Sequence, residues 1–176
     1  MQLKFRGKVW LMTYDHLYCR LDYHEMKEVQ RGRLAPFVLT AENLDIVNAS
    51  PALHKMLGEQ PGFIDGYGFK DADGNIVGVL YLMKKGGTEV LYRIRHIDAY
   101  LFAVRVFREY WGHGYAAEMA AWVMDTLHER GVDQMYLTVK RQNTQAIRAY
   151  EKLGFKVIGR RRFVRIGHTN IPYYSL

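Results

Sequence analysis

The chain has 176 residues, one cysteine and a formal net charge of +7. This length suits a single domain that buries its own core. With Cys19 as the only cysteine, disulfide scaffolds and cysteine-based zinc sites are excluded, and no metal site is predicted. The sequence contains no run of 18 apolar residues, so no membrane span is predicted, and the N-terminus is not typical of a signal peptide. We therefore expect a cytoplasmic protein without a membrane partner.

The first part of the chain has the weakest periodicity. Residues 8–13 and 17–21 indicate a first strand or hairpin, and residues 22–30 a short charged helix. Residues 36–39 read as a connection, and Thr40 as the N-cap of a helix that extends to Val47. A further helix is predicted to begin at Ser50 and Pro51 and to end at Gly58.

The middle of the chain is predicted to be a meander of antiparallel strands. Residues 71–75 (D-A-D-G-N) resemble the start of a calcium loop, but Ile76 stands where that loop needs glycine and Leu82 where it needs glutamate. A hairpin turn is the better interpretation. Strands are expected over residues 76–83 and 88–95, followed by a strand over residues 98–106 that is buried on both faces.

Two glycines follow that buried strand. Gly112 and Gly114 lie where a helix begins that extends to Gly131, so backbone N–H groups and the helix dipole could together bind an anion. The G-x-G pattern alone is weak, because such glycines often serve only as a tight turn. The sequence has no G-x-x-x-x-G-K-[ST] loop, and Ala117 breaks the G-x-G-x-x-G pattern.

The next elements are a strand over residues 135–140 and a helix capped by Asn143 or Thr144. Its apolar face contains Ala146, Ala149, Tyr150 and Leu153, and Gly154 ends it. Strands are then expected over residues 155–158, 163–166 and 171–176.

Two of these segments carry a family pattern. Residues 111–116 (W-G-H-G-Y-A) and 143–155 (N-T-Q-A-I-R-A-Y-E-K-L-G-F) resemble the GNAT superfamily of acyl-CoA-dependent N-acyltransferases. That family has [QR]-x-x-G-x-[GA] followed, after a strand, by N-x-x-[AS]-x-x-x-Y-x-x-x-G-F. Trp111 departs from the usual Gln or Arg, although Tyr-Trp-Gly is similar to the branch of ribosomal-protein and small-amine acetyltransferases. The resemblance covers residues 92–174.

The resemblance implies an α+β fold of three layers. A central, mostly antiparallel twisted sheet would contain a splayed pair of parallel strands, with helices on both faces. The chain would be one N-acetyltransferase domain over residues 1–176. Residues 1–70 would form the acceptor region and residues 88–176 the acetyl-CoA-binding core.

The resemblance also implies the site and its co-substrate, acetyl-CoA. Tyr150 would donate a proton to the leaving thiolate, a role that suits a phenol with a pKa of about 10. Lys152 would meet a phosphate, and Asn143 the pantetheine arm. The strand residues Val104, Arg105 and Val106 would receive pantetheine and polarise the thioester carbonyl. The glycine turn would hold the pyrophosphate through Trp111, Gly112, His113, Gly114, Tyr115 and Ala116.

The general base is left open. The candidates are His96 and Asp98 before the buried strand, Glu109 after it, and His168 or Tyr173 near the C-terminus. For each of them a solvated or packed side chain is favoured over a catalytic one, and family members often work through a water molecule or accept a neutral amine.

The sequence thus predicts an N-acetyltransferase with a primary amine as acceptor, either a small amine or amino-sugar or a protein N-terminus. The alternative is a non-catalytic sensor domain of the same fold that binds acyl-CoA. Nucleic-acid binding rests on net charge alone and is disfavoured, because strand alternation would divide Arg160, Arg161 and Arg162 between two faces. A homodimer is left open.

Overall fold

The computed structural model describes residues 2–4, 10–47, 49, 51–84, 88–89, 94–95, 99–166 and 169–173. The strands are β1 (Gln2–Lys4), β2 (Trp10–Asp22), β3 (Ala35–Leu39), β4 (Ile64–Lys70), β5 (Ile76–Met83), β6 (Thr88–Glu89), β7 (Ile94–Arg95), β8 (Ala99–Val106), β9 (Gln134–Lys140), β10 (Lys156–Ile166) and β11 (Thr169–Tyr173). The helices are α1 (Pro51–Glu59), α2 (Tyr115–Glu129) and α3 (Thr144–Leu153), with 3₁₀ turns η1 (Tyr23–Glu25), η2 (Leu44–Val47) and η3 (Arg108–Tyr110). None of the helices described is both long and apolar enough to span a bilayer.

One large sheet organises the molecule. Its strand order is β11-β10-β2-β9-β8-β5-β4-β3, with β1 paired to β2. Every neighbouring pair is antiparallel except β8 and β9, which are parallel. These two strands pair only from Ala99 with Met135 to Leu101 with Leu137, although β8 continues to Val106 and β9 to Lys140. The predicted splayed parallel pair is therefore confirmed.

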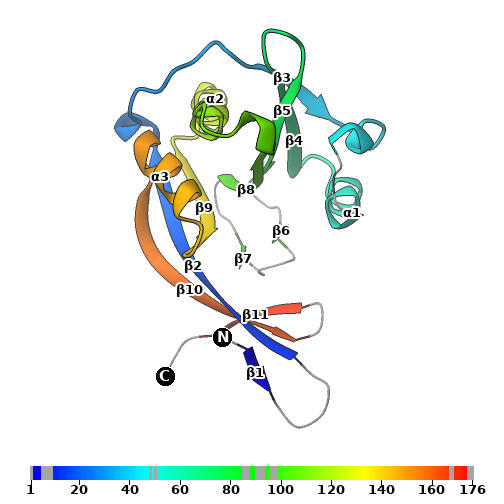
Figure 1. Cartoon of the computed structure of the whole chain (residues 1–176), viewed down its shortest axis with the longest axis vertical. Coiled ribbons are helices and arrows are strands. Elements are labelled where there is room, and N and C mark those ends of the chain that lie inside the picture. The colour runs from blue at the N-terminus through cyan, green and yellow to red at the C-terminus, as the bar shows by residue number, and fades with distance from the viewer. Residues whose placement is uncertain are drawn as a thin grey trace.

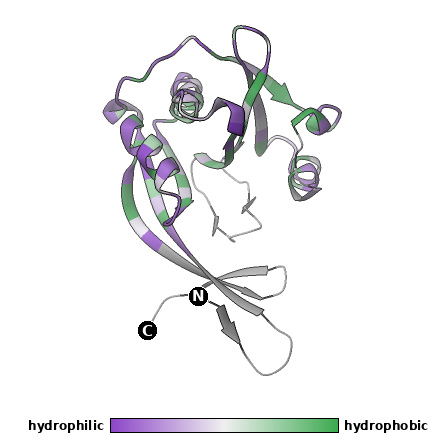
Figure 2. Ribbon diagram, in the orientation of Figure 1, coloured by the Kyte–Doolittle hydropathy of each residue, from purple (hydrophilic) through white to green (hydrophobic). Residues whose placement is uncertain are grey.

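Helices cover both faces of the sheet, as predicted. Figure 1 shows α2 and α3 on one side and α1 on the other. The strand β5 divides its side chains between them: Leu80 and Leu82 join the core beneath α2 and α3, whereas Tyr81 and Met83 pack on the side of α1 and η2. This alternation is typical of a strand that is buried on both faces. Accordingly, β5 is mostly hydrophobic, whereas α3 is mostly hydrophilic (Figure 2). The predicted three-layer α+β fold is confirmed.

The N-terminal half contains several wrong predictions. The helix expected over residues 22–30 is only η1, after which residues 26–34 follow an irregular path that ends at β3, in place of the expected connection over residues 36–39. The helix expected from Thr40 to Val47 is only η2, which follows a turn in which the Asn43 side chain accepts from the Thr40 N–H. The helix at Pro51 is confirmed and ends at Glu59.

The later strands differ in extent from the prediction. Only the first three residues of β8, Ala99–Leu101, are fully buried; from Phe102 onward burial alternates, because β9 has separated from β8. Residues 88–95 are not one strand, since β6 and β7 pair with each other. The strand β10 is continuous where two strands were expected, with a bulge between Val157 and Gly159. The predicted turn at residues 71–75 is confirmed between β4 and β5.

Candidate active site

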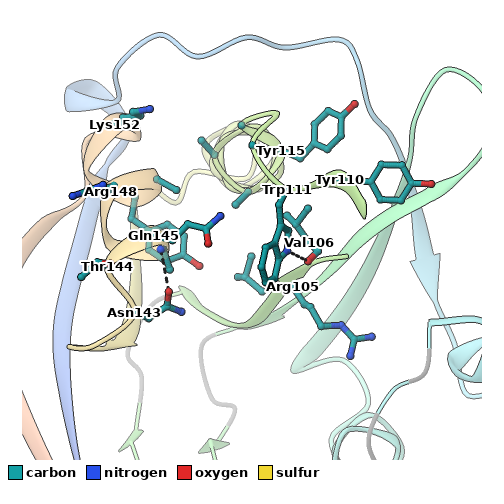
Figure 3. A pocket seen from close by; sticks show the side chains of 18 residues that line it. Arg105, Val106, Tyr110, Trp111, Tyr115, Asn143, Thr144, Gln145, Arg148 and Lys152 are labelled. Carbon is teal, nitrogen blue, oxygen red and sulfur yellow. Dashed lines mark hydrogen bonds between the residues drawn. The ribbon is translucent and has the colours of Figure 1, made fainter. Parts of the chain in front are cut away.

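A cavity of about 570 Å³ lies where β8 and β9 separate. Its walls come from the end of β8, the glycine turn, the start of α2, and α3. Figure 3 shows Trp111 and Val106 on one side and Asn143, Gln145 and Arg148 on the other. The size is typical of a small-molecule site. The lining residues are Val104, Arg105, Val106, Tyr110, Trp111, Gly112, Gly114, Tyr115, Ala116, Ala117, Asn143, Thr144, Gln145, Ala146, Arg148, Ala149, Tyr150 and Lys152.

The glycine turn supplies free donors at one end of this cavity. Gly112 and Gly114 have positive φ angles of 85° and 76°, which favour glycine. The N–H of Glu118 bonds to the Gly114 carbonyl, so the N–H groups of the preceding helical residues, Tyr115 to Ala117, have no acceptor within α2. These donors and the helix dipole suit a phosphate group.

Trp111 closes the turn onto the end of β8. Its indole Nε1 donates to the Val106 carbonyl over 2.8 Å, drawn as a dashed line in Figure 3, while 52% of the residue stays exposed. Because an indole has one donor, that donor is already used within the protein. The side chain therefore shapes the cavity wall and offers no polar contact to a ligand.

Among the residues predicted to bind acetyl-CoA, His113 alone does not line the cavity. Its ring Nδ1 lies 3.0 Å from the Tyr110 carbonyl and 3.1 Å from the Trp111 carbonyl, and the ring stacks on Tyr115. Its carbonyl accepts a hydrogen bond from Arg33. The imidazole is thus held within the turn by its Nδ1, and the backbone N–H is available for the predicted contact.

The strand β8 carries an irregularity where it leaves β9. Ala103 has a φ of 49°, and the register with β5 shifts between the pairs Tyr81 with Phe102 and Val79 with Arg105. Such a bulge re-aims the residues that follow it. The Arg105 guanidinium bonds to the Val47 carbonyl over 2.6 Å. Arg105 lines the cavity, but its guanidinium therefore points away from the cavity (Figure 3).

Tyr150 lies in the wall that α3 contributes. It is 8% exposed, and its ring meets Phe155 edge to face with centroids 5.4 Å apart. Burial, and next to it the charge that Cys19 would carry, raise the pKa of the Tyr150 phenol well above its usual value. The phenol therefore stays protonated and can act as a proton donor.

Asn143 begins α3, as one of the two predicted caps. Its side-chain oxygen accepts from the Ala146 N–H over 3.2 Å, which is also drawn in Figure 3. The amide group keeps both of its own N–H donors for a ligand in the cavity.

The comparisons with known proteins decide the family. The acetyltransferase (GNAT) family matches residues 39–155. The chain belongs to this family. Members generally use acetyl-CoA as co-substrate. No curated protein sequence matches the chain.

Solved structures with this GNAT fold share little sequence with the chain. An acetyltransferase from Colwellia psychrerythraea has a TM-score of 0.63 at 14% identity, covering 88% of this chain and 56% of its own. A conserved protein of unknown function from Staphylococcus epidermidis has a TM-score of 0.66 at 14% identity, covering 88% of this chain and 62% of its own. The spermidine/spermine N-acetyltransferase of Vibrio cholerae has a TM-score of 0.54 at 18% identity, covering 72% of this chain and 82% of its own. The chain thus spans little more than half of the first two proteins.

The sequence did not predict several of the residues that line the cavity. One of them is Arg148, which carries a positive charge and lies one helical turn before the predicted Lys152 on α3. The i, i+4 spacing from Lys152 could have identified Arg148. Tyr110, Ala117, Thr144 and Gln145 carry no comparable signal.

The general base stays unassigned. His96, Asp98 and His168 lie outside the described residues, as does the side chain of Tyr173. Glu109 is exposed in η3 and does not line the cavity.

Proposed function

We propose that this GNAT protein is an N-acetyltransferase that moves an acetyl group from acetyl-CoA to a primary amine. The observation that carries the proposal is the cavity itself, which joins the free donors of the glycine turn to a buried, protonated Tyr150 at the point where the sheet opens. A sheet that opens beside backbone donors gives an extended, anionic thioester a place to bind.

The residues present fit acetyl-CoA. The N–H groups of Gly112 to Ala116 would hold the pyrophosphate, and Lys152 and Arg148 would add positive charge. The backbone of residues 104–106 and the Asn143 amide would hold the pantetheine arm. The thioester supplies an already activated acyl group, so the protein mainly has to position the amine and stabilise developing charge.

Tyr150 would complete the transfer as the general acid. The amine nitrogen forms a bond to the acyl carbon, the carbon–sulfur bond breaks, and the departing sulfur takes the phenolic proton. The amine loses its own proton to water or to a base. A phenol whose pKa is raised by burial is a weaker acid than a free phenol, but it is not ionised at neutral pH, so the proton is in place when the sulfur departs.

Thiol release with a panel of amines tests the assignment. We expect wild type to release thiol with at least one amine, and Tyr150→Phe to reduce turnover about 100-fold, the size of a lost general acid, with coenzyme A affinity unchanged. Equal turnover by both proteins would remove Tyr150 from the mechanism. Binding of acetyl-CoA by wild type without thiol release from any amine would instead support the sensor function.

The panel should cover every acceptor class that the sequence leaves open: small amines, amino-sugars and peptides with a free N-terminus. It should also include spermidine, because the Vibrio cholerae relative is a spermidine/spermine N-acetyltransferase. That likeness concerns the fold alone, so spermidine has no priority. Cytoplasmic location and a homodimer stay predictions.

A further inference from the structure

Residues 26–34, here called the strap, cross the start of α2. Figure 1 shows this segment as the irregular trace from η1 over α2 to β3. The Lys27 N–H bonds to the Leu153 carbonyl at the end of α3, and Arg31 forms an ion pair with Asp125 of α2. The strap is thus attached to both helices that line the cavity.

Arg33 makes the densest set of contacts in the strap. Its backbone N–H donates to Glu118 Oε1 over 2.9 Å, and its Nε and Nη2 lie 2.8 Å from Glu118 Oε2. The guanidinium also lies over the Tyr115 ring, 4.8 Å from its centroid. Glu118 is only 4% exposed, so its carboxylate depends on Arg33 for partners.

The remaining guanidinium nitrogen holds the glycine turn. Arg33 Nη1 donates to the His113 carbonyl over 2.8 Å. That carbonyl and the Gly114 N–H belong to one planar trans peptide, so they point in opposite directions. This hydrogen bond therefore orients the Gly114 N–H away from Arg33, and Gly114 lines the cavity whereas Arg33 does not.

This restraint matters because it acts on a different peptide from the other contacts of the turn. Trp111 and the His113 ring bond to the carbonyls of residues 106, 110 and 111, whereas Arg33 bonds to the carbonyl of the His113–Gly114 peptide. That peptide adjoins a glycine, which can adopt many backbone angles, so it rotates at small cost unless one of its groups is bonded. Arg33 itself does not line the cavity, and three of its five guanidinium N–H donors already have acceptors in Glu118 and His113.

We propose that Arg33, held by the buried Glu118, is a positioning residue that orients the His113–Gly114 peptide for binding of the acetyl-CoA pyrophosphate. The proposal rests on the proposed function. It predicts a loss confined to donors that carry a pyrophosphate.

The test compares Arg33→Lys with wild type. A lysine keeps the charge but has no fork that reaches both Glu118 and His113. We expect the Kd for coenzyme A, measured by calorimetry, to rise about tenfold, the effect of one charge-assisted hydrogen bond. With an amine that wild type accepts, KM for acetyl-CoA should rise similarly and kcat should stay within about twofold. Turnover of S-acetylpantetheine, which has no pyrophosphate, should not change.

Two further variants keep the result interpretable. Arg31→Ala breaks the other ion pair of the strap without touching the turn, and should leave the Kd for coenzyme A unchanged. The double variant Arg33→Met with Glu118→Leu removes the restraint without leaving an unpaired charge. It should weaken the binding of coenzyme A by as much as Arg33→Lys does.

The positioning role would be overturned if Arg33→Lys left the Kd for coenzyme A unchanged. It would also be overturned if the variant lost as much activity with S-acetylpantetheine as with acetyl-CoA. Failure of wild type to bind coenzyme A would instead overturn the proposed function, and this inference with it.

Discussion

The Trp111 indole joins the glycine turn to the end of β8 through its bond to the Val106 carbonyl. Trp111→Phe keeps an aromatic ring but loses this bond. Because one neutral hydrogen bond contributes about 1 kcal/mol, we expect the Kd for acetyl-CoA to rise about fivefold. The free energy of unfolding should fall by no more than about 1 kcal/mol, since a single neutral hydrogen bond is lost and 52% of the residue is exposed. Calorimetry that shows unchanged affinity would mean that the turn holds its shape without Trp111.

At the residue scale, local spacing in the sequence was enough to predict two residues of the cavity wall. Asn143 and Tyr150 lie in one short segment whose pattern is recognisable, and both line the cavity. The partners of Arg33 could not be predicted, because Glu118 is 85 residues away along the chain and only the fold brings them together. The indole bond of Trp111 was missed because the family pattern has a different residue type there.

At the scale of elements, the bulge in β8 lies just after the point where β9 separates from it. Ala103 holds a left-handed backbone conformation with a φ of 49°, which a branched side chain tolerates poorly. We expect Ala103→Val to lower the free energy of unfolding by about 1 kcal/mol and Ala103→Gly to raise it by a few tenths of that amount. Urea unfolding measures both. Strand propensity alone gives the reverse order, so a more stable valine variant would contradict the bulge.

The sequence predicted the strand β8 correctly but predicted burial on both faces along its whole length, which holds only as far as Leu101. The apolar residues of β8 indicate a strand, but not that β9 leaves it after Leu101. Residues 26–30 of the strap were predicted to belong to a helix over residues 22–30, because charged residues are frequent there. Its path is fixed instead by long-range bonds such as that from Lys27 to Leu153.

At the scale of the whole molecule, the sheet buries His16 of β2 to 3% exposure. Burial, and then the charge of Lys140, lower the pKa of His16 to about 4, against the opposing charge of Asp15. Between pH 6.5 and 4 the unfolded chain therefore binds more protons at this residue than the folded protein. The free energy of unfolding should fall on acidification through this range, by about 3 kcal/mol at most from His16.

His16→Gln isolates this contribution, because glutamine does not titrate. Urea unfolding at pH 7 and pH 4.5 should show a smaller loss of stability in the variant than in wild type. Equal losses would mean that His16 accepts a proton in the folded protein without penalty.

The central claim is that the glycine turn binds the anionic part of acetyl-CoA. Calorimetric titration of wild type and of Gly114→Glu with acetyl-CoA tests it most directly, since the variant puts a side chain and a negative charge at a residue whose φ is 76°. We expect micromolar affinity in wild type and no measurable binding in the variant, with both proteins folded by circular dichroism. Equal affinity in the two proteins, or no binding by wild type, would contradict the assignment of this site.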